Sequence, residues 1–207
     1  MSGMETNTEA RERVLEAAER LFAQKGYAAV TLRDIAAEVG IRHTSLYHHA
    51  PGGKEDLFIE VTERNLKRHQ AGLEQAIQAA EPKVQAQLNA VANWLLSQAP
   101  MDLVRMTHVD MPIIAPAHAE RLSSLAFAAL ILPVHMLLQR AQACGEIVHH
   151  DLGLVAGGLV SMIESLHAVP DRALDESGHA QAIAARRMAM AHELIDVMLN
   201  GLYKRST

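Results

Sequence analysis

Apolar residues recur along the chain at the spacing of α-helices, and no stretch alternates between apolar and polar residues as a half-buried strand would. The first clear apolar stripe consists of Val14, Leu15, Ala18, Leu21 and Phe22. Gly26 follows this stripe as a signal for the end of the helix. The pattern predicts an all-α protein.

Two shorter helices are expected next. Thr31 is a suitable N-cap, and Asp34 three residues later gives a variant of the capping box. This helix should carry an apolar stripe from residue 32 to residue 39 and end at Gly40. A third helix fits residues 43–49, because the following sequence Pro51-Gly52-Gly53 breaks a helix.

The rest of the chain continues the helical pattern. Further helices are predicted over residues 54–80, 82–98, 101–108, 117–143, 151–169 and 179–203, with a kink at Pro133 and a loop over 170–178. About nine helices are therefore expected. We predict a first domain over residues 1–53 and a second over residues 54–207.

The composition indicates the class of protein and the cellular compartment that suits it. Apolar residues make up 49% of the chain, which excludes a disordered protein. The single cysteine, Cys144, permits no internal disulfide and no zinc site built from cysteines, as expected for a reducing compartment. The N-terminus shows no signal peptide, and the apolar stretch 152–163 is too short to cross a bilayer. We expect a cytoplasmic protein with no membrane partner.

Residues 31–49 have the spacing of a helix-turn-helix. Ala36 is small enough for two helices to cross closely, and Gly40 four residues later supplies the turn. Leu46, six residues further, is the inward position of the second helix. The pattern predicts a helix-turn-helix, although unrelated helical hairpins share it.

The outward side of this second helix has the chemistry of a DNA-binding surface. Its outward and terminal positions are Arg42, His43, Thr44, Ser45, Tyr47, His48 and His49. This set contains no acid, and every member can donate a hydrogen bond to a phosphate or a base edge. The net charge of −5 argues against general coating of nucleic acid but leaves room for a local DNA-reading face.

The stretch "RERVLEAAERLFAQKGYAAVTLRDIAAEVGIRHTSLYHHAPGGKEDLF", residues 11–58, resembles the N-terminal domain of the TetR family of bacterial transcriptional regulators. The resemblance implies a homodimer whose two N-terminal domains bind the halves of a palindromic operator in double-stranded DNA. It also implies a C-terminal domain that binds a small-molecule effector and thereby releases the DNA, as in a repressor. A ligand-dependent activator and a regulator without a small ligand remain alternatives.

The resemblance also suggests roles for individual residues. It places Thr31 and Arg33 at phosphates, and Arg42, His43, Thr44 and Ser45 at the base-reading end of the third helix. Further phosphate contacts would come from Tyr47, His48, His49 and Lys54. The sequence departs from the family pattern at Ala50, where an aromatic residue is usual, and in a turn that is one residue longer. Both departures affect where Lys54 lies relative to DNA.

The remaining helices suggest a dimer interface and a ligand site. The last two helices have broad apolar faces made of Leu154, Val155, Leu159, Met162, Ile163, Leu166, Ile183, Met188, Leu194, Ile195, Met198 and Leu202. These faces predict a four-helix dimer bundle, or alternatively an ordinary core. A ligand pocket is predicted among the helices of residues 54–143, lined by Trp94, Arg105, Met106, His108, Met111 and Phe127. Each of these six could equally be an ordinary core or surface residue.

Metal and enzyme chemistry fit the sequence poorly. Glu164 and His167 have the spacing of a di-iron helix, but the further glutamate-bearing helices of such a site are missing. His108, Asp110 and His118 are ligand types without a fixed geometry. We therefore predict no enzyme activity, no cofactor and no metal, with a helical-bundle metalloenzyme as the rival. Cys144 could be a redox switch or, in the simpler interpretation, a packed thiol.

Overall fold

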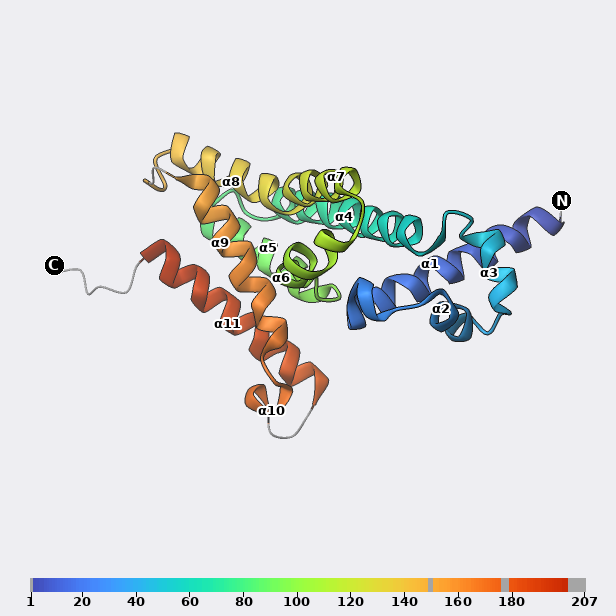
Figure 1. The fold of residues 1–207 in the computed structure, drawn as a ribbon. Helices are drawn as coiled ribbons and strands as arrows, with labels where there is room; N and C mark the ends of the chain where they lie inside the picture. The colour runs from blue at the N-terminus through green and yellow to red at the C-terminus, as the bar shows by residue number, and fades with distance from the viewer. Residues whose placement is uncertain (1, 149–150, 176–178, 201–207) are drawn as a thin grey trace. The chain divides into compact units, whose positions relative to one another are not determined.

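The computed structural model describes residues 2–148, 151–175 and 179–200 (Figure 1). The described residues form helices and connecting turns without any strand, which confirms the all-α prediction. The α-helices are α1 (Ser2–Ala29), α2 (Leu32–Val39), α3 (His43–His49), α4 (Gly53–Ala79), α5 (Val84–Ser97), α6 (Leu103–Arg105), α7 (Pro116–Ala126), α8 (Leu132–Ala143), α9 (Leu152–Ser165), α10 (Asp171–Leu174) and α11 (Ala180–Asn200).

The chain divides into two compact units. The head unit consists of Met1–Lys67 and Asp102–Leu125, and the body unit consists of Arg68–Met101 and Ala126–Thr207. This division differs from the domain boundary predicted between residues 53 and 54. The first part of α4 belongs to the head unit, and so does a segment that follows α5 in the sequence.

The core of the head unit begins with the apolar stripe of α1. All five predicted stripe residues are buried. The rings of Phe22, Tyr27 and Phe58 form a cluster, with centroid distances of 4.9 Å between Tyr27 and Phe58 and 5.2 Å between Phe22 and Phe58. Gly26 has φ 78° and interrupts the helical geometry, which confirms the predicted stop and lets Tyr27 join this cluster.

Hydrogen bonds tie residues 102–125 to the rest of the head unit. The Arg105 guanidinium donates to the carbonyls of Phe22 and Ala23, at 3.1 and 2.8 Å, in the turn of α1 before the break at Gly26. The Asp110 carboxylate is only 3% exposed and accepts the main-chain N–H of Tyr27 at 2.9 Å. These bonds satisfy backbone groups that the break at Gly26 leaves without helical partners.

Two predicted helices are less regular than expected. The helix predicted over 101–108 is α6 followed by a π-helical turn, Met106–Asp110, and a 3-10 turn, Met111–Ile113. The helix predicted over 117–143 is divided into α7 and α8 by a π-helical turn, Phe127–Ile131. Pro133 lies just after that turn, which confirms the predicted irregularity, because proline lacks the N–H that a continuous helix needs.

The body unit packs α11 against α5, and α9 against both α5 and α8 (Figure 1). The loop predicted over residues 170–178 is wrong for residues 171–174, which form α10; residues 176–178 lie outside the described part. Arg187 stabilises this region by donating to the carbonyl of Leu166 at 3.0 Å and to the Asp171 carboxylate at 3.1 Å. The first of these bonds satisfies the Leu166 carbonyl, which follows the end of α9.

The helical run Pro116–Ala143 has the length and hydropathy of a possible membrane span, by length and composition only. Core helices of folded domains meet the same criterion. Val134, Leu137 and Leu138 on this run are buried within the body unit. The part of the run that holds these three residues therefore contributes to the core of the body unit.

Candidate nucleic-acid interface and effector pocket

The helix α2 begins with the predicted capping box. The Asp34 N–H donates to the Thr31 hydroxyl oxygen at 3.2 Å, and the Thr31 N–H donates to the Asp34 carboxylate at 2.8 Å. The Thr31 hydroxyl also donates to that carboxylate, and these bonds lower the pKa of Asp34. The start of α2 is thus fixed locally, with the Thr31 side chain held by Asp34.

A buried corner joins α2 to α3. Gly40 has φ 75°, a conformation that glycine adopts without a Cβ clash, and the Ile41 N–H donates to the Ala36 carbonyl at 2.9 Å. Ala36 and Leu46 are buried. Arg13 of α1 donates to the carbonyl of Val39 at 2.9 Å and so satisfies the end of α2. The predicted helix-turn-helix is confirmed.

The outer side of α3 is exposed and free of acidic residues, as the sequence predicts. Arg42, Thr44 and His48 are exposed, Tyr47 is 50% exposed, and Arg33 on α2 is exposed as well. The other three outward residues of α3, His43, Ser45 and His49, are half-buried. The rings of His43 and Tyr47 meet edge to face, with centroids 5.3 Å apart. This contact between residues i and i+4 orders two side chains on the face that is available to a partner.

The turn after α3 places Lys54 partly inside the head unit. Gly53 adopts φ 82° and donates its N–H to the Ala50 carbonyl at 3.1 Å, and Ala50 is buried. The Lys54 ammonium lies 4.2 Å from the centroid of the Tyr27 ring and 3.4 Å from the Ala28 carbonyl oxygen. Burial lowers the pKa of Lys54, while the charge of Asp110 acts in the opposite direction. A DNA contact by Lys54 remains a prediction.

The six residues predicted to line a ligand site fall into different parts of the fold. Arg105, Met106, His108 and Met111 belong to the head unit, whereas Trp94 and Phe127 belong to the body unit. Met106 and Met111 are buried, and Arg105 holds the end of α1. The proposed ligand role of these six residues remains a prediction.

The residues considered as alternative metal or thiol sites are His118, Asp110 and Cys144, and the structure shows what surrounds each of them. His118 contacts the Glu55 carboxylate at 2.8 Å, and bonds from the Ala115 N–H and from His118 lower the pKa of Glu55. Asp110 is engaged by Tyr27. No group of three potential metal ligands lies together among the described residues. Cys144 is exposed, so its interpretation as a packed thiol is wrong.

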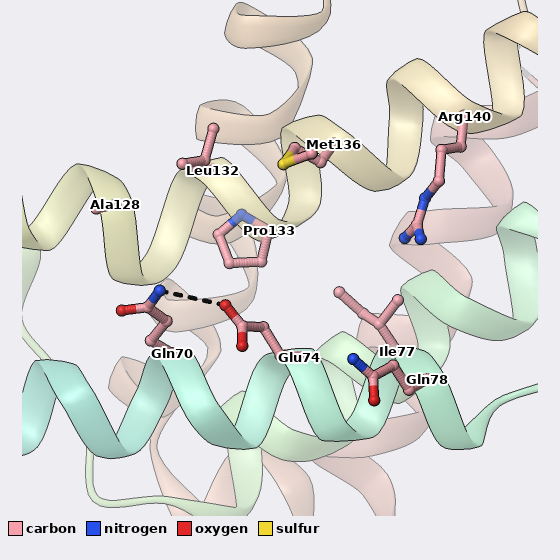
Figure 2. Close-up of a pocket in the computed structure, with 9 residues that line it drawn as sticks. All are labelled: Gln70, Glu74, Ile77, Gln78, Ala128, Leu132, Pro133, Met136 and Arg140. Atoms are coloured by element: carbon pink, nitrogen blue, oxygen red, sulfur yellow. Dashed lines mark hydrogen bonds between the residues drawn. The ribbon is translucent and has the colours of Figure 1, made fainter.

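The body unit contains a groove that the sequence reasoning missed (Figure 2). It has a volume of about 240 Å³ and lies between the second half of α4 and residues 128–140. It is lined by Gln70, Glu74, Ile77, Gln78, Ala128, Leu132, Pro133, Met136 and Arg140. Residues 128, 132, 136 and 140 follow one another at i, i+4 spacing, a helical stripe that starts apolar and ends in arginine. That stripe was the available sequence signal.

Sequence comparisons match the N-terminal part of the chain. Residues 14–61 match the family described as bacterial regulatory proteins, tetR family. The HTH-type transcriptional regulator LmrA of Bacillus subtilis is 50% identical over 52 residues, which are 25% of this chain and 28% of that protein. The matches cover only 19% to 44% of the length of the curated relatives.

Solved structures resemble almost the whole chain. The TetR family transcriptional regulator PfmR from Thermus thermophilus has a TM-score of 0.69 and 24% identity, over 94% of this chain and 98% of its own. AibR, solved in complex with isovaleryl coenzyme A and operator DNA, has a TM-score of 0.67 and 17% identity, over 87% of this chain and 97% of its own. At these identities the likeness shows that the fold is shared.

Proposed function

We propose that the chain is a member of the TetR family of bacterial regulatory proteins, and that it is a cytoplasmic DNA-binding transcriptional regulator and not an enzyme. The observation that carries the proposal is the exposed, acid-free side of α3, held on α2 by the buried Leu46. A short helix of this kind fits the major groove of B-DNA and reads bases with its N-terminal residues.

The predicted division of labour along α3 is part of this proposal. Arg42, His43, Thr44 and Ser45 stand at the N-terminal end of α3, where they would read base edges. Phosphate contacts would come from Thr31, Arg33, Tyr47, His48, His49 and Lys54. To donate to a phosphate oxygen, the Thr31 hydroxyl would turn its single proton away from the Asp34 carboxylate, while its oxygen could still accept the Asp34 N–H.

We further propose a homodimer that binds a palindromic operator and associates through α9 and α11. Part of the predicted apolar set is core of the protomer, because Leu159, Ile163, Leu166, Ile183 and Ile195 are buried. Leu154 is 70% exposed, Met198 is exposed, and Val155, Met162, Met188 and Leu194 are half-buried or exposed. Leu202 lies outside the described residues. An apolar face that its own protomer leaves uncovered favours association with a second copy.

The glycines of α9 support this arrangement. A Cβ atom built at Gly157 or Gly158 would meet no atom within 4 Å in the protomer. Small residues with open space in front of them allow a second helix to approach closely. We therefore expect Gly158→Ala to weaken the dimer in a sedimentation dilution series without loss of helical content. An unchanged dimer would place the interface elsewhere.

The regulator is proposed to be a repressor that a small molecule releases from DNA. AibR, which shares the fold, was solved with both isovaleryl coenzyme A and operator DNA, which supports an effector-responsive regulator. An effector shifts the protein away from the DNA-binding conformation only to the extent that it binds the other conformation more tightly. Activation by the ligand, or regulation without one, would be the alternative outcomes.

The direct test is fluorescence anisotropy with labelled DNA from upstream of the protein's own gene. Specific binding should appear and should weaken steeply as salt rises, because phosphate contacts release counterions. Tyr47→Ala should weaken binding to all sequences about equally, whereas His43→Ala should change the sequence preference. Arg172→Gln, an exposed change of charge on α10, is the control and should leave DNA binding unchanged. Lack of specific binding at every salt concentration would refute the proposal.

A further inference from the structure

The floor of the groove between α4 and α8 is apolar and partly open to solvent. Ile77 and Pro133 are buried, whereas Leu132 is 37% exposed and Met136 is 52% exposed. Figure 2 shows Pro133 of α8 directed toward α4, and Leu132 and Met136 of the same helix also line the groove. An apolar ligand body over these side chains would remove their exposed surface from water, which is favourable.

The lining of the groove carries one positive and one negative side chain. At one end Arg140 lies near Gln78 and Ile77 (Figure 2), and within the described part of the chain its guanidinium makes no hydrogen bond or ion pair. Glu74 lies nearer the middle of the groove, opposite Pro133 (Figure 2), and accepts a hydrogen bond from the Gln70 amide at 3.2 Å. A guanidinium with free donors binds a carboxylate in a bidentate manner, whereas Glu74 repels a second anionic group.

The size of the groove limits the occupant. A volume of about 240 Å³ is below the roughly 300–1,000 Å³ of pockets that hold drug-sized ligands. A complete coenzyme is much larger than this, so only a small molecule, or one arm of a large one, lies within the groove. A molecule with a single anionic end and a short apolar body matches the volume, the apolar floor and the charges of Arg140 and Glu74.

We propose that this groove binds the effector, and that the effector is a small amphipathic monocarboxylate. Its carboxylate would pair with Arg140, and its apolar body would cover Leu132, Pro133 and Met136. This inference rests on the proposed function, because it names the chemical class of the ligand to which the regulator responds. It uses none of the six residues predicted from the sequence, and it assigns the anchoring role to Arg140.

Isothermal titration calorimetry tests the proposal with hexanoate, octanoate and 3-phenylpropanoate as probes. At least one probe should bind at one site per chain, and Arg140→Gln should weaken it tenfold or more. The uncharged amide of the same acid should bind at least tenfold more weakly to the original protein and should be insensitive to Arg140→Gln. Octanedioate should bind more weakly than octanoate, and Glu74→Gln should reduce that difference, because it removes the repulsion of the second carboxylate.

The control is Arg172→Gln, which removes an arginine outside the groove and should leave probe binding unchanged. Circular dichroism would verify that each variant keeps its helical content. Failure of all three probes to bind, or equal affinity in Arg140→Gln and the original protein, would overturn the inference. Neither result bears on DNA binding measured without ligand, so a failure here and a failure of the proposed regulator can be told apart.

Discussion

The carboxyl group of Glu164 gives a prediction about the dependence of stability on pH. Glu164 lies on α9 and accepts the main-chain N–H of Met101 at 3.0 Å. Burial raises its pKa from the ordinary 4.5 to about 7, and the bond from Met101 opposes this rise only in part. The folded protein therefore binds the Glu164 proton more tightly than the unfolded chain does.

The sign and size of the effect follow from this difference. The stability that Glu164 contributes is fully present below pH 4.5 and is lost as pH rises through about 7. Each pH unit corresponds to about 1.4 kcal/mol, so the interval from 4.5 to about 7 amounts to about 3 kcal/mol. His69 acts in the opposite direction, because burial lowers its pKa from 6.5 to about 4. Its contribution is present above pH 6.5 and is lost as pH falls through about 4.

The two groups largely offset each other between pH 4.5 and 6.5, and Glu164→Gln removes one of them. Between pH 5 and pH 8 we expect the unfolding free energy of Glu164→Gln to rise by about 2.5 kcal/mol relative to that of the original protein. Urea unfolding at fixed protein concentration measures this difference. Glu120→Gln, an exposed carboxyl, is the control. A difference that is the same at both pH values would refute the reasoning.

Two further substitutions test the packing. Gly72→Ala would place a Cβ 1.9 Å from the Trp94 ring, so we expect a loss of about 1–3 kcal/mol in urea unfolding. Gly153→Ala, whose Cβ would have only ordinary contacts, should change stability by less than about 1 kcal/mol, and equal losses for both would contradict the packing argument. Asp110→Ala should cost about 2–4 kcal/mol and speed hydrogen exchange at the Tyr27 amide, with Asp110→Asn losing less, because an amide oxygen can still accept. Slow exchange at Tyr27 in Asp110→Ala would show that this bond is dispensable.

The local features of the head unit could be predicted because their causes lie within a few residues. Thr31 and Asp34 are three positions apart, and the cap they form needs no distant partner. Gly40 ends α2 because of its own backbone freedom. The burial of Leu46 follows from the same short pattern. Signals of this kind can be read from one sequence.

Long-range partners could not be predicted in the same way. Asp110 and Tyr27 are 83 positions apart, and either residue alone is compatible with many surroundings. The groove forms because α4 and α8 lie side by side. The sequence alone does not show that Arg140 lies across from Gln78 and Ile77. The six residues proposed for a ligand site were chosen by type, and residue type alone does not determine which helices meet.

The interleaving of the two units limits how this chain can be recombined with a relative. The chain passes from one unit to the other after Lys67, after Met101 and after Leu125. Consider a chimaera that takes residues 1–67 from this chain and everything after residue 67 from a relative. Its head unit would combine residues 1–67 of this chain with the relative's counterpart of residues 102–125. The Tyr27 N–H and the end of α1 would then meet side chains that did not evolve with them. Exchange of operator specificity between relatives should therefore succeed when residues 102–125 are transferred together with residues 1–67.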